Sequence, residues 1–158
     1  MMYYVRDGVR TLEFTGVKLA ESTSRDILKP RWVEFELYRT VTGQYVLARI
    51  GVSVYYHSED CQTVVRNKLS AVDGSGLSAA YVPCDFCTPE KLAIEGVYPE
   101  TPRYAAYVCA DGVSVVASLM KQDKNRTEYL TNVARRLLTD ASRLDQDVAD
   151  AFFTDRIE

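Results

Sequence analysis

Residues 55–87 read YYHSEDCQTVVRNKLSAVDGSGLSAAYVPCDFC and contain the only histidine of the chain and three of its four cysteines. His57 and Cys61 form an H-x3-C pair, and Cys84 and Cys87 form a C-x2-C pair after a gap of 22 residues. A C-x2-C turn directs two sulfurs from one tight bend, and an i,i+4 pair can direct both side chains to one side. The sequence therefore predicts a structural Zn²⁺ bound by these four residues, which ties together distant segments.

Two other interpretations of the cysteines stay open. A C-x2-C sequence also occurs in redox-active thiol pairs, and a buried cysteine can be an ordinary small core residue. The histidine four residues before a third cysteine favours metal over both. The fourth cysteine, Cys109, lies between Val108 and Ala110 with no basic neighbour that would activate it. We expect it to be a packed core thiol.

Residues 55–89 resemble the metal-binding motif of Ada-type DNA repair proteins. In that family an aromatic residue and a first ligand precede x3-Cys, and after a variable loop the motif ends in Pro-Cys-x2-Cys-x-Pro. The matching positions in this chain are Tyr56, His57, Cys61, Tyr81, Pro83, Cys84, Cys87 and Pro89. The resemblance implies a metal site and, as an alternative function, a module that contacts nucleic acid.

This chain departs from the Ada pattern in two ways. His57 stands where the family has a cysteine, in the pair that accepts a methyl group from a DNA phosphotriester. Asp85 and Phe86 stand where the family has basic residues. Of the properties of the Ada family, we therefore expect only the metal site in this chain. The N-terminal half resembles a family of small uncharacterised proteins through FTGVKLAES (14–22) and LYRTVTGQYV (37–46), and that resemblance implies no function.

His57, Glu59 and the Cys84/Cys87 pair also approach the H-x-E…P-C-x2-C signature of zinc deaminases. In those enzymes the fourth zinc position holds water and the glutamate transfers protons. Cys61 would fill that position here, and a site with four protein ligands is structural. We therefore expect a non-enzymatic, zinc-stabilised binding or regulatory domain. The alternative is a zinc-dependent hydrolase or deaminase that uses Glu59.

The charge distribution bears on the class of partner. The net charge is −3, and Lys/Arg against Asp/Glu number eight and eight in residues 1–60, four and five in 61–110, and seven and nine in 111–158. Because binding to polyanions needs an excess of positive charge, a protein partner is expected and nucleic acid is not favoured. No apolar run reaches about 20 residues, so no membrane partner is expected. Cysteines suited to metal and an N-terminus unlike a signal peptide favour the cytoplasm.

Alternating apolar residues predict an antiparallel β-meander of three or four strands in the N-terminal half. The expected strands are residues 11–19, 32–40, 45–50 and 52–56, the last of which ends at His57. Val33, Phe35 and Leu37 share one face of the second strand, and Thr42-Gly43 provides a turn. Gly16 is expected at a bulge or a close approach, and residues 21–30 are expected to form a loop.

The C-terminal part is expected to contain a hairpin and a long amphipathic helix. Residues 104–110 read as a strand, Asp111-Gly112 is a turn signal, and residues 113–120 form either a returning strand or a short helix. Apolar residues then recur at helical spacing, at positions 130, 133, 137, 141, 144, 148 and 152. This pattern predicts one long helix after Asn125 or Thr127, or two with a bend near Ser142.

The helix is expected to pack on the sheet, although a homodimer seam would show the same pattern, so the chain is expected to be a monomer or a homodimer. Asp145, Asp147 and Asp150 are spaced around the helix, which favours a solvated face. The sequence thus predicts an α+β fold with a sheet and zinc module in residues 1–88 and a connector with three prolines in 89–103. Residues 104–158 form the C-terminal part, packed with the rest as one domain.

Overall fold

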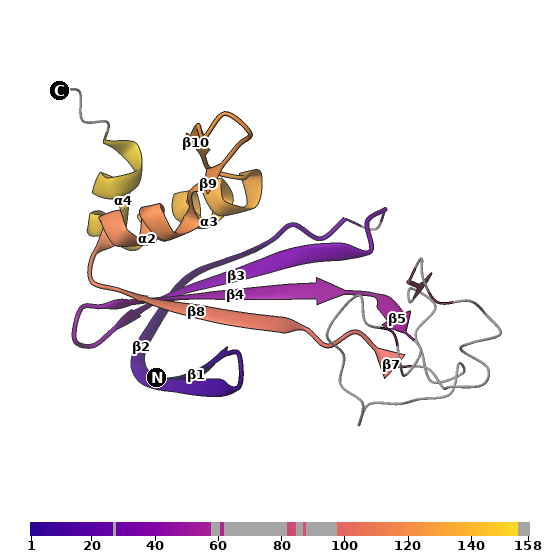
Figure 1. Ribbon diagram of the computed structural model, residues 1–158. Coiled ribbons are helices and arrows are strands. Elements are labelled where there is room, and N and C mark those ends of the chain that lie inside the picture. The colour runs from indigo at the N-terminus through magenta and orange to yellow at the C-terminus, as the bar shows by residue number, and fades with distance from the viewer. Residues whose placement is uncertain (27, 58–60, 62–81, 85–86, 88–97, 155–158) are drawn as a thin grey trace. The chain divides into compact units, whose positions relative to one another are not determined.

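The computed structural model describes residues 1–26, 28–57, 61, 82–84, 87 and 98–154 (Figure 1). These residues form two compact units. The first unit contains the described residues of Met1–Ser24, Val33–Ile50 and Tyr104–Glu158. The second contains those of Arg25–Trp32 and Gly51–Arg103. The domain boundaries expected at residues 88 and 103 stay a prediction.

Five strands form the main sheet, in the order β1-β2-β3-β4-β8. Their bounds are β1 (Met2–Asp7), β2 (Arg10–Thr23), β3 (Arg31–Thr40), β4 (Tyr45–Ser53) and β8 (Arg103–Cys109). β2 pairs antiparallel with both β1 and β3. The predicted α+β fold with an N-terminal antiparallel meander is therefore confirmed. The strand β1 was not predicted from the sequence, and β2 continues to Thr23, into residues that were expected to form a loop.

Three helices cover one face of this sheet (Figure 1): α2 (Gly112–Leu119), α3 (Asn132–Ser142) and α4 (Gln146–Phe153). The larger hydrophobic core lies between the helices and the strands. Its fully buried members include Leu37 and Leu47 from the sheet and Val115, Leu137 and Val148 from the helices. Cys109 is 5% exposed within this core, which confirms the expected packed thiol.

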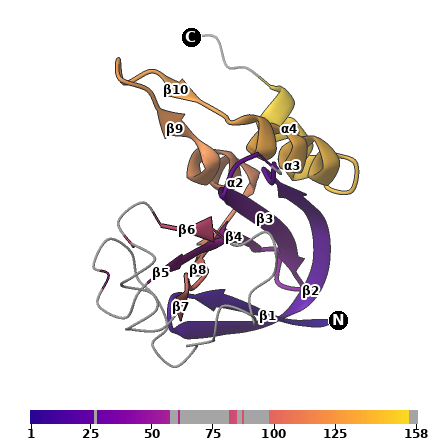
Figure 2. The same cartoon turned by 90° about the vertical axis from the view of Figure 1, so that its right-hand side faces the viewer.

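The opposite face of the sheet is covered by the β1–β2 hairpin, which curls beneath it (Figure 2). Close approach of two backbones makes this possible at Gly16, where a Cβ atom would lie 2.1 Å from the carbonyl oxygen of Arg39. The expected role of Gly16 as a close-approach point is confirmed. The register of β2 against β3 then shifts between Lys18 and Ala20. This bulge turns β2 from one core to the other.

The chain after β8 forms a helix instead of the returning strand of a hairpin. Asp111 is the N-cap of α2, and its Oδ1 accepts hydrogen bonds from the Ser114 N–H and hydroxyl at 2.8 and 2.7 Å. The turn signal at Asp111-Gly112 was thus a helix cap, for which aspartate is equally suited. Val115 and Leu119 lie one helical turn apart and are both buried, so packing outweighs the strand preference of the valines.

Two helices occupy the region of the predicted long helix, which agrees with the predicted alternative of two helices with a bend near Ser142. The first, α3, begins after the N-cap Thr131, and Asn125 and Thr127 lie before it in a hairpin of β9 (Lys121–Gln122) and β10 (Glu128–Tyr129). The predicted N-caps were therefore wrong. A second N-cap, Asp145, starts α4. Leu144 lies in the break and is 69% exposed, although the apolar pattern placed it inward.

Asp145 does not lie on a solvated face as expected, because its residue is only 4% exposed. Its carboxylate accepts hydrogen bonds from the Tyr45 hydroxyl at 2.8 Å, Arg39 Nη1 at 2.9 Å and the Val148 N–H at 3.0 Å. Burial and this carboxylate together raise the pKa of Tyr45 above its usual range. The network joins the start of α4 to β3 and β4, so it contributes to packing and not to a solvent-facing site.

Three short strands form the sheet of the second unit, in the order β6-β5-β7. They are β5 (Tyr55–His57), β6 (Val82–Pro83) and β7 (Tyr98–Pro99). β5 runs parallel to β6 and antiparallel to β7. His57 is the last residue of β5, which confirms the expected strand end. Among the helices in the described ranges, none has both the length and the apolar character that a bilayer crossing needs.

Candidate metal centre

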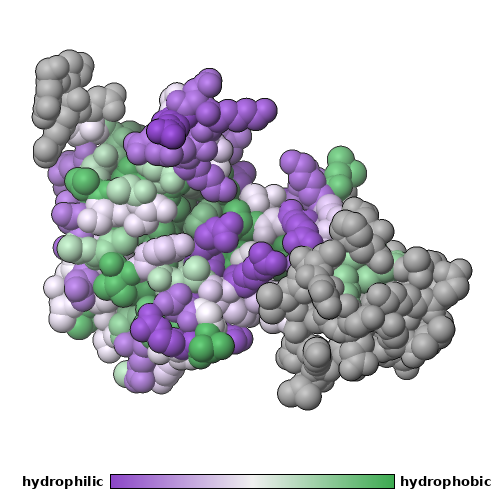
Figure 3. Space-filling view, in the orientation of Figure 1, coloured by the Kyte–Doolittle hydropathy of each residue, from purple (hydrophilic) through white to green (hydrophobic). Residues whose placement is uncertain are grey.

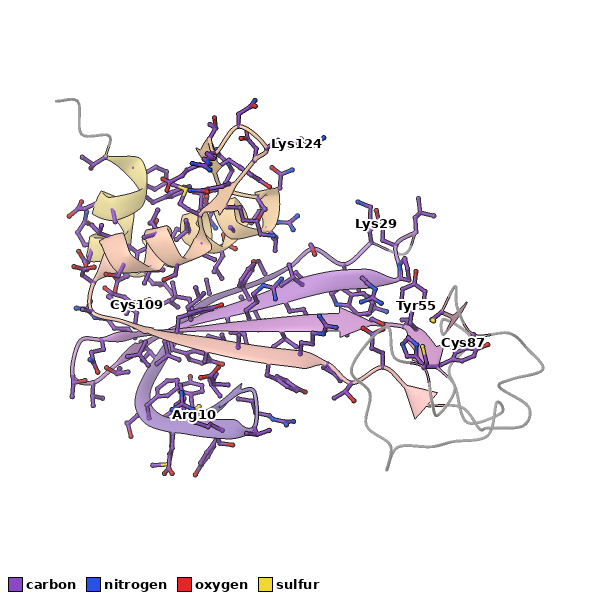
Figure 4. The ribbon with its side chains drawn as sticks, in the orientation of Figure 1. Arg10, Lys29, Tyr55, Cys87, Cys109 and Lys124 are labelled. Atoms are coloured by element: carbon purple, nitrogen blue, oxygen red, sulfur yellow. The ribbon has the colours of Figure 1, made fainter. Side chains whose placement is uncertain are left out.

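The structure brings His57, Cys61, Cys84 and Cys87 together in the second unit. One ligand atom from each lies within 4.8 Å of those of the other three, and all four residues are buried. The exposed fractions are 0% for His57 and 5 to 7% for the cysteines. The grouping of four candidate ligands predicted from sequence spacing is thus present as a possible metal-binding cluster. Figure 4 labels Cys87 in this cluster and Tyr55 beside it.

Strand pairing explains how ligands distant in the chain meet. Tyr55 and Tyr56 of β5 pair with Val82 and Pro83 of β6, and the Cys84 N–H donates to the Tyr56 carbonyl at 3.0 Å. His57, the last residue of β5, and Cys84, which directly follows β6, therefore lie at the same end of two hydrogen-bonded parallel strands. Tyr55 and Tyr56 are partly buried and pack against the cluster of the three cysteines.

The sulfur positions fit a shared ion better than a disulfide. The Cys87 N–H donates to the Cys84 carbonyl at 3.1 Å, which closes the C-x2-C turn. The Sγ of Cys84 lies 3.6 Å from that of Cys87 and 3.8 Å from that of Cys61. Disulfide sulfurs lie about 2.05 Å apart. Two thiolates that bind one zinc at about 2.3 Å in tetrahedral geometry lie about 3.7 Å apart.

His57 has one ring nitrogen in a hydrogen bond and one without a partner. Its Nε2 lies 3.2 Å from Glu100 Oε2, and the carboxylate requires Nε2 to be the donor. Its Nδ1 is buried and has no hydrogen-bond partner in the described part of the chain. A buried nitrogen lone pair without a partner is costly. A metal ion held with the three sulfurs would satisfy it, so the donor set fits a cation.

Glu100 is a site residue that the sequence analysis missed. Its side chain is 4% exposed, and besides His57 it accepts hydrogen bonds from Arg31 Nη1 and from the Ser53 hydroxyl, each at 3.0 Å. The backbone N–H of Glu100 donates to the Tyr55 carbonyl at 3.0 Å. Metal-binding histidines commonly donate their second N–H to a carboxylate, which fixes the ring and its tautomer. No spacing rule connects His57 to a glutamate 43 residues away.

We predict that Glu100→Gln will weaken metal binding by about 10- to 100-fold, the usual effect of losing a carboxylate behind a ligating histidine. The amide keeps the size of the side chain but gives His57 a weaker acceptor and leaves Arg31 without its ion pair. Competition with a chromophoric zinc chelator measures the affinity. Glu13→Gln, at an exposed position of β2, is the matched control and should leave the zinc affinity unchanged. An unchanged affinity in Glu100→Gln would contradict the assigned role.

Several residues named from the sequence lie outside the described residues. They include Glu59, the candidate acid–base residue of the deaminase alternative, and Tyr81, Asp85, Phe86 and Pro89 of the Ada-like motif. Catalysis by Glu59 therefore stays a prediction. Comparisons of the chain with models of protein families, with curated proteins and with solved structures found no match.

Proposed function

We propose that His57, Cys61, Cys84 and Cys87 hold a structural Zn²⁺, and that the chain is a non-enzymatic, zinc-stabilised binding or regulatory domain. The observation that carries the proposal is the closed donor set, with four buried side chains and a histidine nitrogen that has no hydrogen-bond partner among the described residues. Three sulfurs and one imidazole are typical of structural zinc, which takes four protein ligands. Hard cations such as Mg²⁺ and Ca²⁺ prefer oxygen ligands, which supports zinc further.

The closed site also supports a structural role over catalysis. A catalytic zinc ion keeps one position for water or substrate. Here the fourth position would be taken by Cys61, whose side chain is buried beside Cys84. The partner of the domain, for which the sequence favours a protein, and its place in the cytoplasm remain proposals.

A Cys61→Ser variant tests the structural role against the enzymatic one. If all four ligands are needed, the purified variant will contain much less than one Zn²⁺ per chain and will lose structure in the second unit. A site that needs only His57, Cys84 and Cys87 would retain the metal and bind water in the fourth position, which would favour the enzyme. Cys109→Ser is the matched control, because Cys109 lies in the core of the first unit and should leave the zinc content unchanged.

A further inference from the structure

The β9–β10 hairpin and the start of α3 carry a local excess of positive charge in an acidic chain. Residues 121–136 contain five of the nineteen Lys and Arg residues but two of the twenty-two Asp and Glu residues. Residues 121–129 are all exposed (Figure 3, where hydrophilic side chains gather at this hairpin). Residues 111–158 as a whole are net negative, because the aspartates in and around α4 outweigh this local excess of Lys and Arg.

Strand pairing places the acidic residue Glu128 on the opposite face of the hairpin from Lys121. Lys121 lies opposite Tyr129, and Gln122 lies opposite Glu128. Because neighbouring side chains of a strand point to opposite faces, Lys121 and Tyr129 share one face and Glu128 lies on the other. Arg135 of α3 donates from Nε to the Leu130 carbonyl at 3.4 Å, so its guanidinium lies beside the base of the hairpin.

In the turn between the two strands, the carboxylate of Asp123 is hydrogen-bonded to the backbone, and Lys124 and Arg126 add two more cations. Asp123 Oδ1 accepts the N–H groups of Asn125 and Thr127 at 2.8 and 2.9 Å. Arg126 has a φ of 62°, the only positive φ of a non-glycine residue in the described part of the chain. Glycine adopts this conformation at lower cost. Arg126 thus adds a cationic residue to the turn that also contains Lys124, which Figure 4 labels.

We propose that Lys121, Lys124, Arg126, Tyr129 and Arg135, here called the hairpin surface, bind single-stranded nucleic acid. None of the four cations forms an ion pair within the described residues, so each is available to a phosphate. Tyr129 is 43% exposed and offers a ring on which a base can stack. This surface lies in the first unit, so the proposal does not depend on the identity of the metal.

Other anionic partners fit the hairpin surface less well. An anionic membrane is contacted best by segments that combine cations with large apolar side chains, and Tyr129 is the only large hydrophobic residue exposed between residues 121 and 129. An acidic protein would satisfy the cations but has no base to stack on Tyr129. Single-stranded nucleic acid uses both features.

The test is fluorescence anisotropy of a labelled oligothymidine of about 12 nucleotides, titrated with the zinc-loaded full chain at several salt concentrations. Four phosphate contacts give a slope of log K against log salt of about −3. Lys124→Gln should weaken binding about eightfold at about 50 mM salt and reduce the slope by about 0.7. Lys29→Gln is the matched control, because Lys29 is exposed, lies outside the hairpin surface and loses the same charge.

Two further variants separate binding from folding. Arg126→Gly should weaken binding about eightfold while the thermal midpoint stays the same or rises, because glycine relieves the backbone conformation at this position. Tyr129→Phe should retain binding, whereas Tyr129→Leu should lose about tenfold or more because it removes the stacking ring. The proposal is overturned by absence of binding at low salt or by equal losses in Lys29→Gln and Lys124→Gln. Full binding by Tyr129→Leu, or tighter binding to anionic vesicles or polyglutamate, overturns it as well.

Discussion

Removal of the Zn²⁺ proposed at His57, Cys61, Cys84 and Cys87 is expected to unfold the second unit and leave the first unit folded. The described strands β5, β6 and β7 are only two or three residues long, and the buried cluster among the described residues of the second unit consists of Cys61, Cys84 and Cys87 with two tyrosines against them. This described cluster offers few apolar side chains to offset the conformational entropy of ordering β5, β6 and β7. Structural zinc in small domains contributes on the order of 10 kcal/mol, so its removal dominates the balance.

Hydrogen exchange read by mass spectrometry measures this effect with and without a strong chelator. Peptides that contain β5 and β7 should lose their protection after chelation. Peptides from β3 and α3 should keep theirs, because the larger core is built from apolar side chains and includes none of the four ligands. Added Zn²⁺ should restore the protection and added Mg²⁺ should not. Unchanged exchange in β5 would show that the fold of the second unit does not depend on a metal.

The second large effect is expected from Leu137→Ala in α3. Leu137 is fully buried in the larger core, and truncation of a buried leucine costs about 2–5 kcal/mol, depending on how far the cavity collapses. Leu144→Ala removes the same atoms from a side chain that is 69% exposed, so its cost should stay within about 0.5 kcal/mol. Urea unfolding followed by a probe in the first unit measures both.

The comparison of the two leucines also tests the break between α3 and α4. The apolar pattern of a single continuous helix places both side chains inward, whereas two helices separated at residues 143–145 expose Leu144. Equal and large losses of stability in both variants would contradict the break. A large loss in Leu137→Ala alone supports it.

The metal cluster could be predicted from sequence because its chemistry is local in each pair. The H-x3-C and C-x2-C spacings alone identify four residues that the structure brings together. Glu100 could not be found in this way, because its position beside His57 depends on the pairing of β5 with β7 and on the contacts of Arg31 and Ser53. Such contacts follow from the folded arrangement and leave no periodic signal.

The errors in the fold have equally specific causes. Aspartate serves both in turns and at helix N-caps, so Asp111 could be read either way and Asp145 went unnoticed as the start of a second helix. The alternation of β3 was correctly read, because Val33, Phe35 and Leu37 all face the larger core. The other face of the sheet was missed as a core. Tyr38 is 4% exposed there, covered by a hairpin whose first strand was not predicted.

X-ray absorption at the zinc edge of the freshly purified protein examines the proposed site itself, because it reports the ion and its ligands together. We expect one zinc ion per chain, with three sulfurs at about 2.3 Å and one nitrogen at about 2.0 Å. The ligand shell should be the same in wild type and Cys109→Ser. Protein without zinc, or a zinc shell with fewer than three sulfurs and an oxygen in their place, would contradict a closed structural site formed by His57, Cys61, Cys84 and Cys87.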